Sequence, residues 1–134
     1  MEKKLLLSTL AGFLVIFFGG WVLFGMLLKS SMEKFMAAMG SCAMSEPSFV
    51  PMIVAQLAIS LLLAWLIVRM NRTSFAGGAI LAAWVTFLII VWYDGWMFAT
   101  FPFMTMEMSL VDVLGNTALG ALAGGVMGWV ASKV

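Results

Sequence analysis

Four long stretches of almost unbroken apolar sequence constrain this chain more than any other feature. They cover residues 5–28, 49–68, 75–99 and 110–131. A helix that rises about 1.5 Å per residue needs about 20 apolar residues to cross a hydrocarbon core about 30 Å thick. We therefore predict an all-α membrane protein, a bundle of four transmembrane helices that forms one domain over residues 1–134.

The composition indicates that lipid, not water, is the solvent for most of the chain. Hydrophobic residues make up 64% of it and charged residues 10%, whereas a soluble domain carries about 25% charged residues. Runs such as residues 61–68 do not alternate between polar and apolar residues, as the strands of a membrane barrel do. A helix makes its backbone hydrogen bonds within its own segment, which lipid cannot provide. The first stretch exceeds the apolar core of a signal peptide, so we expect it to be a span.

The distribution of basic residues predicts the orientation in the membrane, because cytoplasmic loops carry an excess of Lys and Arg. With four spans, Lys29 and Lys34 fall on one side of the membrane. The other side receives Lys3, Lys4, Arg69, Arg72 and Lys133. We therefore predict that both termini lie in the cytoplasm, for a multi-pass protein of the bacterial inner membrane, which is the plasma membrane.

The longest connection, residues 29–47, carries an apolar stripe at helical spacing. The stripe consists of Met32, Phe35, Met36 and Met39. This spacing predicts a short amphipathic helix between the first and second spans. The helix either lies on the outer membrane surface or packs over the end of the bundle.

Polar residues inside the predicted spans are the main functional candidates, because ionisable groups are costly in lipid. Gln56, Asp94, Asp112 and Asn116 come from three spans and are expected in one layer of the outer leaflet. One interpretation is a polar pocket or ion pathway that opens outward. In the other, Asp112 completes a capping box with Ser109, and Asp94 lies in the headgroup region beside aromatic neighbours.

A ridge of glycines marks the last span. Gly120, Gly124 and Gly128 form two consecutive GxxxG units, a spacing that lets helix backbones approach closely. Their partner is either another helix of the same chain or a second copy. Within the chain, the small residues over 77–83 form a matching surface.

Few residues are suited to metal or covalent chemistry. The chain has no histidine and one cysteine, which excludes histidine bases, histidine-ligated metals and an internal disulfide. Met104, Met106 and Met108 form an alternating triplet whose soft thioethers suit Cu(I), or they are ordinary apolar residues. No cofactor is expected. A net charge of +1 gives no electrostatic reason to expect nucleic acid.

The layout resembles a family of small bacterial four-helix membrane proteins of unknown function. The resemblance rests on the glycine and aromatic cluster of residues 19–25, on Gly77-Gly78-Ala79, and on a last span that ends in Gly128-Trp129. It implies a plasma-membrane location and no particular activity. No residue roles follow from it.

Three functions are compatible with these features. The small size and short loops favour a non-catalytic accessory or scaffold protein, whose partners are lipids and other membrane subunits or further copies of itself. The alternative is an oligomeric channel or transporter for a cation, proton or small polar solute that uses the polar layer. An enzyme that acts on lipids is disfavoured, because no nucleophile is paired with a base.

Overall fold

The computed structural model describes residues 2–42 and 48–134, which are almost entirely helical and contain no strand. Four stretches are long and apolar enough to cross a membrane. The first comprises α1 (Glu2–Val22) and the π-helical turn η1 (Leu23–Leu27), and the others are α3 (Phe49–Arg69), α4 (Phe75–Thr100) and α5 (Met106–Lys133). The prediction of an all-α chain with four potential spans is confirmed.

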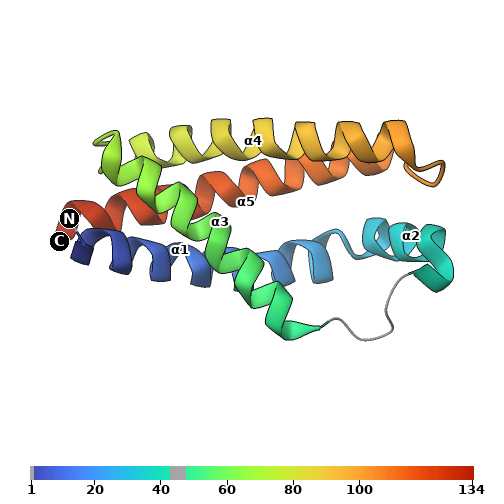
Figure 1. The fold of residues 1–134 in the computed structure, drawn as a ribbon, viewed down its shortest axis with the longest axis horizontal. Helices are drawn as coiled ribbons and strands as arrows, with labels where there is room; N and C mark the ends of the chain where they lie inside the picture. The colour runs from blue at the N-terminus through green and yellow to red at the C-terminus, as the bar shows by residue number, and fades with distance from the viewer. Residues whose placement is uncertain (1, 43–47) are drawn as a thin grey trace.

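The four long helices run along the length of the molecule, with α3 inclined to the others (Figure 1). Helices α4 and α5 lie side by side over most of their length, α1 packs along α5, and α3 crosses in front of them. Both chain ends lie at the same end of the bundle as the α3–α4 turn (Figure 1). That turn contains Asn71, whose φ of 57° is a left-handed conformation that asparagine tolerates.

Small residues allow α4 and α5 to approach closely. A Cβ atom on Gly124 would overlap the carbonyl oxygen of Gly78 and the Cβ of Ala82. A Cβ atom on Gly120 would overlap the side chain of Thr86, and one on Gly128 would overlap the backbone of Ser74. The glycine ridge therefore packs against another helix of the same chain, α4, which is one of the two partners considered above.

The hydrophobic core occupies the half of the bundle near the termini. It contains Leu63 and Ile67 of α3 and Met127 of α5, all almost fully buried. The hydroxyl of Ser8 donates to the carbonyl oxygen of Met127 at 3.3 Å and so joins α1 to α5. On α3 the buried residues begin only at Ser60. The bundle is therefore closed at the terminal end and loosely packed at the opposite end.

The first predicted span ends differently from the expectation. The α-helical pattern changes at Leu23 into a π turn, in which the Leu28 N–H donates to the Leu23 carbonyl at 2.7 Å. Leu28 then leaves helical geometry, and α2 (Lys29–Met39) starts in a new direction, followed by the 3-10 turn η2 (Gly40–Cys42). Residues 43–47 of the predicted connection lie outside the described residues.

The last span begins one turn earlier than predicted. Thr105 is the N-cap of α5, and its hydroxyl oxygen accepts from the Met108 N–H at 3.2 Å. The capping box predicted at Ser109 is therefore wrong, because Thr105 already satisfies a free N–H group of the first turn. Asp112 lies inside the helix and needs another explanation.

We expect Gly124→Ala to destabilise the protein by about 1–3 kcal/mol, because the added methyl group overpacks the α4–α5 contact. Unfolding in detergent, followed by circular dichroism, measures this change. Gly95→Ala is the matched control, since nothing lies within 4 Å of its Cβ position. That variant should be neutral or slightly stabilising, because alanine favours the helix. Equal effects of the two variants would contradict close packing at Gly124.

Candidate functional site

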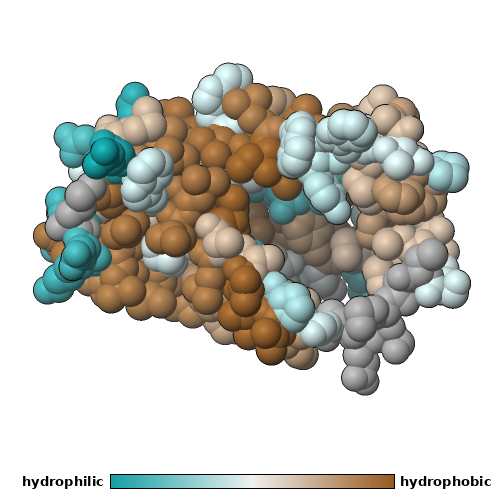
Figure 2. Space-filling view, in the orientation of Figure 1, coloured by the Kyte–Doolittle hydropathy of each residue, from teal (hydrophilic) through white to brown (hydrophobic). Residues whose placement is uncertain are grey.

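A cavity of about 480 Å³ lies in the half of the bundle away from the termini. Its walls come from the end of α1, η1, α2, the first half of α3, α4 and α5. Figure 2 shows a hollow on the long side of the molecule, with hydrophilic groups in its depth, hydrophobic surface on the side toward the termini and some weakly hydrophilic residues along its rim. The cavity exists because α3 packs on the bundle only from Ser60 onward.

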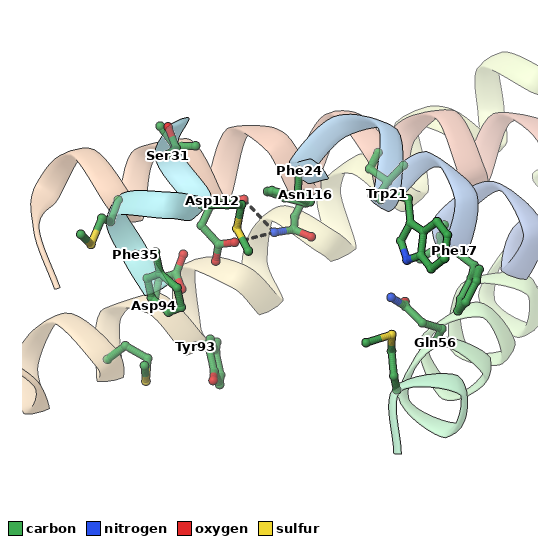
Figure 3. Close-up of a pocket in the computed structure, with 18 of the residues that line it drawn as sticks. Phe17, Trp21, Phe24, Ser31, Phe35, Gln56, Tyr93, Asp94, Asp112 and Asn116 are labelled. Atoms are coloured by element: carbon green, nitrogen blue, oxygen red, sulfur yellow. Dashed lines mark hydrogen bonds between the residues drawn. The ribbon is translucent and has the colours of Figure 1, made fainter. Parts of the chain in front are cut away.

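Asp94 of α4 is the most unusual side chain in this cavity. It is only 4% exposed, and its Oδ2 atom has no hydrogen-bond partner among the described residues. Its carboxyl group faces that of Asp112 on α5, close enough for the two to interact directly (Figure 3). Burial of an acceptor without a partner costs about 1–3 kcal/mol, so this arrangement opposes stability.

Asp112 is held in place by its own helix. The Asn116 amide nitrogen donates to the Asp112 Oδ1 atom at 2.8 Å and to its carbonyl oxygen at 2.9 Å (Figure 3). The two residues are four apart and therefore share one face of α5. The hydrogen bonds fix the carboxylate toward Asp94 rather than toward the lipid.

The acid pair has no basic partner in the cavity. Among the described residues that line it, none is Lys or Arg. Two carboxylates at close range repel each other unless they share a proton or bind a cation. Within the described part of the chain, no group of three or more His, Cys, Asp or Glu side chains could hold a metal ion. The repulsion within the pair would therefore be relieved by a shared proton or by a bound cation.

Comparisons with known protein families, with curated proteins and with solved structures find no match to this chain. The resemblance to small bacterial four-helix proteins therefore stays a prediction. Function must be inferred from the cavity itself.

Gln56 lies apart from the other three predicted polar residues. All four line the same cavity. Figure 3 shows Gln56 across the cavity, on α3, whereas Asp94, Asp112 and Asn116 gather on α4 and α5. The separation follows from the inclination of α3, which carries its first half away from α4 (Figure 1).

The methionine triplet does not form a common site in the structure. Met104 is buried, whereas Met106 is 60% exposed. Met106 and Met108 belong to the first turn of α5, where residues two apart lie on nearly opposite faces. Met104 and Met108 contribute to the cavity wall instead.

The apolar wall of the cavity was not predicted as part of a site. Aromatic rings from α1, η1, α2 and α4 form much of it, namely those of Phe17, Trp21, Phe24, Phe35 and Tyr93. In the sequence, aromatic residues near the end of a span look the same whether they face lipid or a cavity. Only the apolar stripe of the 29–39 segment gave a hint, since Met32 and Phe35 both reach the cavity.

Helix α2 lies beside the cavity at the end of the bundle away from the termini. Phe35 packs edge-on against Phe103 of the α4–α5 connection, with ring centroids 6.0 Å apart. The Lys34 ammonium lies 3.6 Å from the Glu107 carboxylate at the start of α5. Both ends of this ion pair are well exposed, so it positions α2 with little energy of its own.

We expect Asp94→Asn to raise the free energy of unfolding by on the order of 1 kcal/mol, because an amide is cheaper to bury and can donate to Asp112. Thermal unfolding in detergent without ligand measures the change. Glu2→Gln, at the exposed opposite end, should have no effect. A loss of stability in Asp94→Asn would indicate that the carboxylate has a structural role.

Proposed function

We propose that this chain is an integral membrane protein that binds a cation, proton or small polar solute at the Asp94–Asp112 pair and carries it across the membrane. The observation that supports this function is the burial of Asp94, whose carboxyl group faces a cavity and a second acid and whose Oδ2 atom has no hydrogen-bond partner among the described residues. A charged group in lipid costs about 2.5–3.5 kcal/mol on insertion scales. Binding of a positive ligand would offset that cost.

The packing favours a carrier over an open channel. The cavity occupies one half of the bundle, and the almost fully buried side chains of Leu63, Ile67 and Met127 form a packed core in the other half. A solute at the acid pair therefore meets a closed core on one side. Passage requires this core to separate, as in alternating access, in which two parts of a protein rock about a fixed site.

The accessory or scaffold role stays a prediction from size and loop length. A subunit that only contacts partners through its surface has no need of a buried acid pair. For this reason the transport alternative is preferred, with lipids and further copies of the chain as the proposed partners. No catalytic group is assigned.

The side of the membrane from which the solute enters depends on the orientation. We propose the arrangement predicted from the basic residues, with both termini in the cytoplasm of a bacterial cell and the cavity in the outer leaflet. Trp65 and Trp129 are compatible with this arrangement, because they would anchor the terminal end of the bundle at a membrane interface. The Arg69 guanidinium lies 6.0 Å from the centroid of the Trp65 ring, and the Lys133 ammonium lies 6.0 Å from that of Trp129.

A reporter fused to the C-terminus tests this orientation. We expect green fluorescent protein to fluoresce there, because it folds in the bacterial cytoplasm, and alkaline phosphatase to be inactive, because it needs the oxidising periplasm. The reverse pattern would place the cavity in the inner leaflet. Fusions to the α3–α4 turn at Asn71 should give the same result as C-terminal fusions.

Transport is tested in proteoliposomes that contain the purified protein. We expect flux of protons or monovalent cations, followed by pH-sensitive and ion-sensitive dyes, to fall at least about tenfold in the Asp94→Asn/Asp112→Asn double variant, because a charge-assisted contact worth about 1.4 kcal/mol or more is lost. Glu2→Gln is the control and should transport like the parent. Unchanged flux in a correctly folded double variant would contradict the proposed function.

A further inference from the structure

We propose that the ligand of this cavity is a lipophilic organic cation, a single positive charge on an apolar body, that reaches the acid pair sideways from the lipid. The inference rests on the proposed function, since it names the ligand class of the same site. Three properties of the cavity carry it: its lining, its charge and the direction in which it opens.

The lining is too apolar for a hydrated inorganic ion. Sites for such ions replace the water shell with a ring of oxygen ligands. Here both acids and Asn116 gather at one charged polar point, and Gln56 lies apart across the cavity, while aromatic rings and methionine side chains form most of the wall. The cavity volume of about 480 Å³ falls in the range of about 300–1,000 Å³ typical of sites for drug-sized molecules. An amphiphile with one charge matches an apolar wall with one charged point.

The charge of that polar point selects a cation. Asp94 and Asp112 face the cavity, and none of the lining residues that the structure describes is basic. An anionic headgroup would meet two acids, and a neutral molecule would leave the negative charge of the pair uncompensated. Trp21 and Tyr93 also line the cavity, and the faces of aromatic rings attract organic cations.

The cavity opens toward the lipid rather than along the bundle axis. The hollow in Figure 2 lies on the long side of the molecule, between the first half of α3 and the far end of α4. Met52 and Gln56 of α3 and Tyr93 and Met97 of α4 line the cavity, and these two helices border the side opening. The first half of α3 has no buried residue before Ser60, so no other helix among the described residues fills the gap.

The outward end of the cavity is covered, which leaves the side opening as the route of access. Helix α2 lies over that end through the contact of Phe35 with Phe103 and the ion pair of Lys34 with Glu107. Lipophilic cations concentrate in the bilayer because their apolar bodies leave water. Lipophilic cations would therefore reach the side opening from the bilayer, where their concentration is highest.

Equilibrium binding of radiolabelled tetraphenylphosphonium to the protein in nanodiscs tests the ligand class. We expect saturable binding that weakens at least about tenfold in the Asp94→Asn/Asp112→Asn double variant, because the charge-assisted contact is lost. The neutral analogue triphenylphosphine oxide and the hydrophilic cation tetramethylammonium should compete poorly. Trp21→Phe, which keeps an aromatic face, should bind more tightly than Trp21→Ala.

The outcomes separate this inference from the function on which it rests. Equal binding to the parent and to a folded double variant overturns the inference, because the acids then play no part. Absence of binding, with proton or inorganic cation flux that still requires the acid pair, also overturns it and leaves the transport function standing. Loss of both binding and acid-dependent flux rejects both.

Association rates test the route. We expect Met52→Trp, which narrows the side opening, to slow the binding of tetraphenylphosphonium by about tenfold or more, since most of the barrier then lies at that opening. Lys34→Gln, which removes the ion pair over the outward end, should leave the rate unchanged. A faster rate in Lys34→Gln with no change in Met52→Trp would overturn the sideways route.

Discussion

The contact between α4 and α5 holds the two halves of the site together. Because Gly78 and Gly124 have no side chains, the two backbones approach closely, and the same packing brings Asp94 and Asp112 face to face further along the helices. Larger residues at the glycines would push the helices apart and move the carboxyl groups out of reach of each other. Close packing in one half of the bundle is thus the condition for the polar arrangement in the other half.

That arrangement opposes stability, and the rest of the bundle offsets it. The Oδ2 atom of Asp94 is buried without a partner among the described residues, while Asn116 is committed to Asp112. The core around Leu63, Ile67 and Met127 does not include Asp94. A stable core in one half and an unfavourably buried acid in the other are expected in a protein whose ligand offsets the cost of burying that acid.

The sequence predicted the features that depend on composition and spacing alone. The apolar stretches gave the four spans, and depth along them placed Asp94, Asp112 and Asn116 in one layer. The separation of Gln56 could not be predicted, because the inclination of α3 depends on how Ser60 and Leu63 pack against other helices. The break at Leu28 was missed because the apolar run continues through it. The start of α5 was missed because Thr105 and Ser109 offer similar caps, and only the structure shows which one is used.

The inclined α3 has a further consequence for how the membrane itself acts on the protein. Its second half is anchored in the core, whereas its first half has no buried residue. A helix held at one end adjusts its tilt when the thickness of the bilayer differs from its own apolar length. A thinner bilayer would tilt α3 further, and a thicker one would bring it upright, which changes the distance between Gln56 and the acid pair. Lipid chain length would then act on the width of the cavity without touching any residue of the site.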